Sequence, residues 1–396
     1  MAPAAGAALP SLRRRGLAHG AYWFLAMTTA GVMLPYFALY LREDAGLSGT
    51  QVGAVFATMP LVGMATQPLW GTVADRTGLR ARVLVVLCLG SAAGFLAIGA
   101  ARAFPALLAA TAACALFARA LIPMSLSVSI PAFADHAHAF GFVRALGTIG
   151  FGAAMFGLPA LLSRGAAPPD LARLFPAAAA LAVATGLAAL ALPGGGVLAL
   201  RSQPGEWRGL ARNRPFRRLL VLCAGAFLFQ NGPIELFPVL VRARGGDLES
   251  IRTFWLWMLV PEVVLVALLG TALARFSPRS LLALGLAAGG LRWLGTAALG
   301  SLAWLGPLQA LHAVVVLGLM IGAPLYLDAA VPPQLRSTAQ AGFAVVSVGI
   351  GGTASSLLSG WLLDAGGPAA PCWVGGAGSL LLALAAPRWL PRAARC

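Results

Sequence analysis

The sequence predicts an all-α membrane protein with twelve transmembrane helices in two pseudo-symmetric six-helix halves. Three observations support this fold class: a mean hydropathy of +0.85 with only 10% charged residues, apolar runs that recur to the C-terminus, and a repeat at half the chain length. An apolar helix of about 20 residues spans the hydrocarbon core of a bilayer. The ten-residue alternating segments typical of a transmembrane β-barrel are not seen in the sequence.

The apolar runs divide the 396 residues into twelve expected spans, separated by short polar segments. The expected spans are 17–41, 51–74, 81–101, 104–133, 140–163, 171–193, 216–241, 251–274, 280–300, 304–327, 336–363 and 369–390. The first run is too long for a signal peptide and lacks a small-residue cleavage site, so we expect an uncleaved first helix. The five cysteines are scattered and form no CxxC motif, so neither disulfides nor a metal site is expected.

The net charge of +16 is explained by membrane topology. All 28 basic residues are arginines; 18 fall in the termini and in loops on the same side, and seven fall in the opposite loops. This asymmetry follows the positive-inside rule and places both termini in the cytoplasm, with the chain a multi-pass protein of the inner (plasma) membrane. Nucleic-acid binding is therefore not expected.

A repeat divides the chain at its middle. GTVADRTGLR (71–80) aligns with GTALARFSPR (270–279) at an offset of 199 residues, and FALYLR (37–42) aligns with FPVLVR (237–242) at an offset of 200. Parallel repeats of this kind are a known transporter design, with the substrate site between the halves near the bilayer midplane. We expect an N-terminal half at 1–199, an arginine-rich cytoplasmic linker at 200–218 and a C-terminal half at 219–396.

The segment GTVADRTGLRAR concentrates charge in an apolar chain. It holds Asp75, Arg76, Arg80 and Arg82, spaced by Gly71 and Gly78. It resembles the loop 2–3 signature of the major facilitator superfamily, which implies a gate on the cytoplasmic side. In that reading Asp75 pairs with arginines or helix ends, and breaking these pairs shifts an equilibrium between two conformations.

The two glycines of this gate motif have expected structural roles. Gly71 would let helices approach closely, and Gly78 would permit a tight turn. The alternative for the whole segment is that its charges only set topology. The second-half copy has Ala274 in place of Asp75, which predicts a weaker gating role there.

Three ionisable residues lie inside consecutive spans at a similar depth. By the helical rise, Glu262, Arg292 and His312 lie about 10, 14 and 10 Å from the outer membrane edge. Charges within a membrane are costly unless paired or hydrated, so each is a candidate functional residue. The alternative is a static buried ion pair beside a core histidine.

The segments RWLG, LLALGL and DAAVPPQLRSTAQA, with this Glu–Arg–His set, resemble the lactose permease and phenylpropionate permease branch of the superfamily. The resemblance implies that Glu262 responds to protons, that Arg292 is its charge partner and that His312 is a hydrogen-bonding relay. The sequence departs from the sugar permease in three places. Val315 replaces a second carboxylate, Arg119 lies in a span without an acid, and Leu146 stands where a tryptophan is expected after Arg144.

These departures favour an anionic solute, with an organic or aromatic acid preferred over a sugar and with Arg119 and Arg144 as its binding residues. Alternatively, Arg119 pairs with Asp135 or reaches toward the cytoplasm. Glu235, with Gln230 and Asn231, either lines the outer mouth or has a capping role.

We therefore expect a secondary active transporter that takes up a small organic solute with protons by alternating access. It would act as a monomer in the bilayer, without a cofactor or metal. The alternatives are a proton-coupled exporter of drugs or metabolites and a non-transporting membrane sensor. No Walker loop, HExxH motif or plausible catalytic triad is present in the sequence, so an enzyme is not expected.

Overall fold

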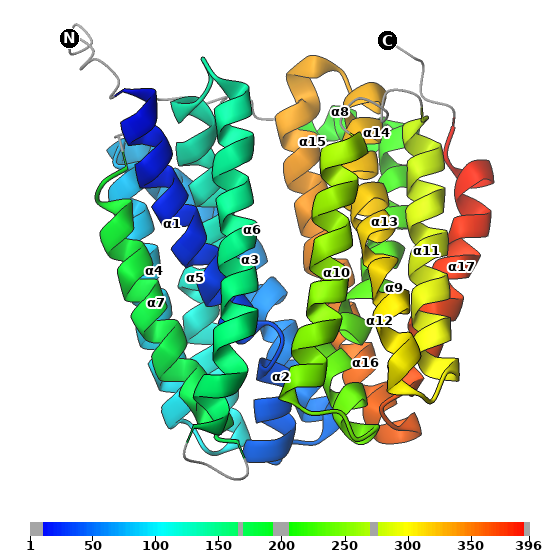
Figure 1. Ribbon diagram of the computed structural model, residues 1–396. Coiled ribbons are helices and arrows are strands. Elements are labelled where there is room, and N and C mark those ends of the chain that lie inside the picture. Colours follow the sequence, from blue (N-terminus) through cyan, green and yellow to red (C-terminus); the bar gives the residue numbers. More distant parts are fainter. Residues whose placement is uncertain (1–10, 165–168, 193–205, 270–275, 392–396) are drawn as a thin grey trace, which may run out of the picture.

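The computed structural model describes residues 11–164, 169–192, 206–269 and 276–391. Figure 1 shows two helical bundles side by side, with the start of α1 (Leu12–Met33) and the end of α17 (Ala370–Trp389) at the same end. We call this the terminal end and the other the opposite end. The described residues are almost entirely helical and contain no strand.

The first bundle contains the elements up to residue 189. After α1 they are α2 (Phe37–Leu39), the π-helical turn η1 (Tyr40–Asp44), α3 (Gly49–Thr77), α4 (Arg80–Ala100), α5 (Phe104–Ala132), α6 (Ala137–Ser163), the 3₁₀ turn η2 (Leu171–Arg173) and α7 (Leu174–Ala189).

The second bundle follows a short helix, α8 (Glu206–Arg212), which lies within the predicted linker. Its elements are α9 (Arg214–Ala243), α10 (Leu248–Leu269), α11 (Pro278–Ala298), η4 (Leu302–Trp304), α12 (Leu305–Ala310), α13 (His312–Val316), η5 (Leu317–Gly322), α14 (Ala323–Ala330), η6 (Pro333–Leu335), α15 (Arg336–Phe343), η7 (Ala344–Gly351), α16 (Gly352–Gly366) and α17. The last five residues predicted as linker, 214–218, form the start of α9.

The predicted twelve-helix membrane fold is confirmed. In the described part of the chain, eleven helical segments are long and apolar enough to cross a membrane. Helix α10 is the twelfth; it is 22 residues long and carries Glu249, Arg252 and Glu262. Charges of this kind raise the cost of insertion, and their presence in a span marks a functional segment.

Glycines bring helices into close contact within and between the halves. A side chain at Gly150 on α6 would collide with the backbone of Phe24 on α1. On α16, Gly360 packs against Gly49 and Gly53 of α3, in the other half. Because lipid does not drive helices together as water does, close backbone packing of this kind holds membrane helices in contact.

Polar contacts join the halves at the opposite end. Arg242 on α9 donates to both carboxylate oxygens of Glu43, at 2.8 and 3.1 Å. Asp364 on α16 accepts hydrogen bonds from the backbone N–H groups of Gly49 and Thr50 at the start of α3. This end of the protein is therefore closed.

Candidate functional site

The centre of the second half contains a buried arginine with a full set of polar partners. Arg292 on α11 is 1% exposed. Its Nε donates to Oε1 of Gln309 at 2.8 Å, and its Nη1 lies 3.0 Å from Nδ1 of His312. Its guanidinium also lies 4.0 Å from the ring centre of Trp293. A buried charge is costly without such compensation, so these contacts explain how the arginine is accommodated.

His312 follows the break between α12 and α13 and lies beside Arg292. This contact determines which nitrogen of the imidazole carries the proton. A guanidinium can only donate hydrogen bonds, so Nδ1 of His312 must accept. The ring proton of the neutral imidazole is therefore on Nε2, which faces Glu262 Oε2 at 3.8 Å. A protonated His312 would present a donor to Arg292, so this arrangement requires the neutral form.

The structure thus brings Glu262, His312 and Arg292 together, as their similar depths predicted. The sequence-based expectation that Arg292 is the direct charge partner of Glu262 differs from the geometry, because the described contacts link the two through His312. Glu262 follows Pro261 on α10, and its side chain is 31% exposed.

Arg144 on α6 interacts electrostatically with Glu262 across the interface between the halves. Its guanidinium lies 4.4 Å from the ring centre of Trp23, which is fully buried on α1. Stacking on an aromatic ring holds a cation without neutralising it. The Arg144 side chain therefore remains able to bind another group.

A second arginine and carboxylate interact across the halves in the same way. Arg119 on α5 interacts electrostatically with Glu235 on α9. The Glu235 carboxylate accepts from Ser356 Oγ at 2.8 Å and from Asn231 Nδ2 at 3.4 Å. The Nε of Arg119 is buried and has no hydrogen-bond partner among the described residues. Arg119 and Arg144 of the first half thus each interact electrostatically with a carboxylate of the second.

A cavity of about 350 Å³ lies between the halves beside Arg119. It is lined by α3 and α5 on one side and by α15 and η7 on the other, with Gln67 adding an amide to an otherwise apolar wall. The cavity lies near the middle of these helices, whereas the opposite end is closed. With the opposite end closed, this is the arrangement expected of one state of an alternating-access protein.

Two sequence-based alternatives do not agree with the structure. Arg119 does not pair with Asp135, because Asp135 forms a bidentate pair with Arg15, at 3.1 and 2.9 Å. Gln230 does not line an outer mouth. It is buried, where it accepts from Trp293 Nε1 and donates to Ser379 Oγ, and it therefore ties α9 to α11 and α17.

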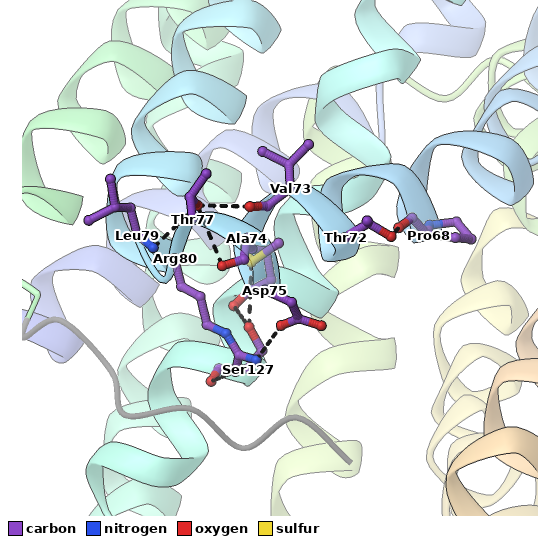
Figure 2. A network of polar contacts seen from close by, with 10 residues as sticks. Pro68, Thr72, Val73, Ala74, Asp75, Thr77, Leu79, Arg80 and Ser127 are labelled. Atoms are coloured by element: carbon purple, nitrogen blue, oxygen red, sulfur yellow. Dashed lines mark hydrogen bonds and ion pairs between the residues drawn. The ribbon is translucent and has the colours of Figure 1, made fainter. Parts of the chain in front are cut away.

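Asp75 and Arg80 of the gate motif form a small polar network with Ser127 (Figure 2). Arg80 Nη2 donates to Asp75 Oδ1 at 2.6 Å, and Arg80 Nη1 donates to the carbonyl of Ser127 at 3.4 Å. The tight turn predicted at Gly78 is present, with φ +67° between α3 and α4. These contacts all stay within the first half, so the motif does not join the halves in this conformation.

The other motif residues are exposed. Arg76 and Arg82 lie at the surface. The close helix approach expected at Gly71 is not found, because a Cβ there would meet no atom within 4 Å. Most of the second-half copy, including Ala274, lies outside the described residues.

Several site residues were not singled out from the sequence. Gln309 lies one turn before His312 and so shares its face, a spacing that could have identified it. Trp23 and Ser356 gave no comparable signal, because their roles depend on helices far away in the chain.

The twelve-helix fold, the central cavity between two halves and the paired charges around it define a secondary transporter. A family model described as "MFS_1 like family" matches residues 19–371. The chain belongs to this family of the major facilitator superfamily.

Known proteins of similar sequence and structure agree. A maltose permease from Geobacillus stearothermophilus is 31% identical over 351 residues, covering 87% of this chain and 86% of the permease. The uncharacterized transporter YwbF from Bacillus subtilis is 24% identical over 356 residues, covering 89% and 88%. A crystal structure of the nucleoside transporter NupG (D323A mutant) has a TM-score of 0.86 at 16% identity, covering 95% of this chain and 100% of that one. The homologues are transporters rather than enzymes.

Proposed function

We propose that this protein takes up a neutral, polyhydroxylated solute such as an oligosaccharide, coupled to protons, by alternating access. The observation that carries this proposal is that two arginines of the first half interact electrostatically with two carboxylates of the second, Arg119 with Glu235 and Arg144 with Glu262. In the proposed orientation both termini lie in the cytoplasm of the inner membrane, so the cavity described above is reached from inside.

The balance of charge between the two halves favours a neutral solute. The preference for an organic acid depended on the lack of an acid in the spans that carry Arg119 and Arg144. The second half supplies an opposing carboxylate for each, so an anion would face negative charge beside every cation. A sugar hydroxyl can accept from a guanidinium and donate to a carboxylate at the same time. The similarity to a maltose permease supports the same class of substrate.

Glu262 is the proposed proton-responsive group, with His312 as its relay and Arg292 as the fixed charge behind the relay. The 3.8 Å gap between His312 Nε2 and Glu262 is longer than a hydrogen bond, so a small movement of α10 would make or break this contact. Movement of the halves can thereby be linked to the protonation of the carboxylate. Asp75 and its motif would act at the terminal end when that end closes.

An organic or aromatic acid remains the second candidate substrate. The unpartnered Nε of Arg119 favours it, because a carboxylate is the partner that this donor lacks in the described structure.

Counterflow in proteoliposomes tests the proposal. Labelled maltose, a purine nucleoside and benzoate would be offered separately to the wild type, to Arg144→Gln and to the control Arg164→Gln, which alters an exposed arginine at the end of the same helix. We expect exchange of maltose or the nucleoside, lost only in Arg144→Gln. Exchange of benzoate alone would contradict a neutral solute and support an organic acid as the substrate.

A further inference from the structure

A basic hollow lies at the terminal end, outside the transport pathway. It has a volume of about 380 Å³ and is lined by Arg214, Arg217, Arg218, Val221 and Trp389. The first four residues have the spacing i, i+3, i+4 and i+7 and so share one face of α9. Trp389, at the end of α17, forms the other wall.

Two helices hold this hollow in shape. Arg218 Nη1 donates to the carbonyl of Trp389 at 3.2 Å, and Trp389 Nε1 donates to the carbonyl of Arg218 at 3.0 Å. The Arg218 guanidinium also lies 5.5 Å from the centre of the indole ring. The start of α9 and the end of α17 are therefore fixed to each other.

The remaining two arginines have no internal partner. In the described part of the chain no carboxylate lies within ion-pair distance of Arg214 or Arg217. Both side chains are exposed. Positive-inside topology explains charge at this end, but it does not require three arginines around one hollow.

The position of the hollow indicates what it binds. Tryptophan is enriched at the boundary between membrane and water. Val221, which lines the hollow, is 61% exposed, and Trp389 is 44% exposed, so the hollow has apolar surface beside its arginines. Basic pockets between helices on the cytoplasmic side bind anionic lipid headgroups.

We propose that this hollow binds the phosphate of an anionic phospholipid, with Arg214 and Arg217 as its ligands and Trp389 as the aromatic wall. Guanidinium groups suit this role because they bind phosphate oxygens in pairs. The proposal relies on the orientation stated above only for the choice of leaflet.

Native mass spectrometry of the full-length protein in detergent tests this site. Phosphatidylglycerol would be added, with phosphatidylcholine as the zwitterionic comparison. Removing both arginines, as Arg214→Gln with Arg217→Gln, should weaken phosphatidylglycerol binding about 30-fold, at roughly fivefold for each contact. The control pair Arg13→Gln with Arg14→Gln removes equal charge from exposed arginines of α1 and should stay within about twofold of wild type.

Other outcomes would overturn the site. An equal loss of phosphatidylglycerol binding in both double variants would show that only net surface charge matters. No loss of binding in either variant would show that the hollow is not a lipid site. Displacement of the lipid by millimolar inorganic phosphate would make the ligand a free anion. None of these results depends on transport, so they are separate from the proposed function.

Discussion

Asp364 on α16 caps the first turn of α3 by accepting two hydrogen bonds from Thr50, one from its backbone N–H and one from its hydroxyl, each at 2.7 Å. The two residues belong to different halves. Backbone N–H groups at the start of a helix, which have no partner within that helix, therefore donate to a carboxylate of the other half. A carboxylate at a helix N-terminus is also favoured by the helix dipole. The contact therefore helps to close the opposite end.

The first prediction concerns this cap. Asp364→Asn should shift the protein toward opening of the opposite end, because the amide has one acceptor oxygen where the carboxylate uses two. The lost hydrogen bond contributes about 0.5–1.5 kcal/mol and so shifts the ratio of the two conformations by up to about tenfold. Spin labels at Ala103 and Ser301, which lie in exposed loops of different halves, would report the separation by double electron–electron resonance in a background without the five native cysteines.

Asp247→Asn is the matched control, because Asp247 bonds only to nearby Ser250 in its own loop among the described contacts. It should leave the distance distribution unchanged. If Asp364→Asn also leaves it unchanged, the cap does not hold the gate.

The second prediction concerns the gate motif. Asp75→Asn should slow exchange while leaving thermal stability nearly unchanged, because in this conformation the half-exposed Asp75 pairs only with Arg80, and a pair of this kind contributes about 1 kcal/mol or less. Melting temperature and counterflow rate would be measured together. Asp170→Asn removes a similarly exposed carboxylate paired with Arg173 and should keep the wild-type rate. Equal rates in both variants would mean that the motif serves topology alone.

Two substitutions at His312 distinguish the roles of its two ring nitrogens. Asparagine can present an acceptor where Nδ1 accepts from Arg292, whereas glutamine reaches toward the position of Nε2. His312→Gln should therefore lower the melting temperature, since loss of a hydrogen bond to a buried charge costs about 1.5–3 kcal/mol. His312→Asn should keep stability and change the pH dependence of transport. The reverse order of stability would show that the assigned tautomer is wrong.

The fourth prediction uses Asp135, which lies in the turn before α6. Its hydrogen bonds from Arg15 lower its pKa to about 2. A carboxylate with a lowered pKa contributes stability at any pH above its ordinary value near 3.9, and that contribution is lost as the pH falls toward 2. His136 Nδ1 also lies 3.1 Å from Asp135 Oδ2, so the test uses a His136→Gln background. In that background Asp135→Asn should lower the melting temperature equally at pH 5 and pH 8. If the decrease in melting temperature differs between pH 5 and pH 8, the proton response belongs to this turn instead of the central site.

The fold was predictable because the bilayer imposes it. A span must be apolar and about 20 residues long, and arginine placement follows topology, so helix number follows from the sequence. The turn at Gly78 was predictable for a similar local reason, since only glycine adopts that conformation without strain.

The central site was predictable in part. Glu262, Arg292 and His312 lie at a similar depth in the membrane, which follows from the helical rise per residue alone. The pairing of Arg119 with Glu235 was not predicted, because it depends on how the two halves face each other. The sequence-based preference for an organic acid considered only the acidic residues in the same spans as Arg119 and Arg144. The preference changes because the relevant carboxylates come from the other half.

Proton movement driven by solute tests the central claim most directly. Proteoliposomes with wild type, Glu262→Gln or the control Glu249→Gln would receive the solute identified by counterflow, while external pH is recorded. Glu249 lies on the same helix, is 50% exposed and pairs with Arg252. We predict external alkalinisation with wild type and Glu249→Gln, and its loss in Glu262→Gln while solute exchange continues. A signal of wild-type size in Glu262→Gln would contradict proton coupling through this carboxylate.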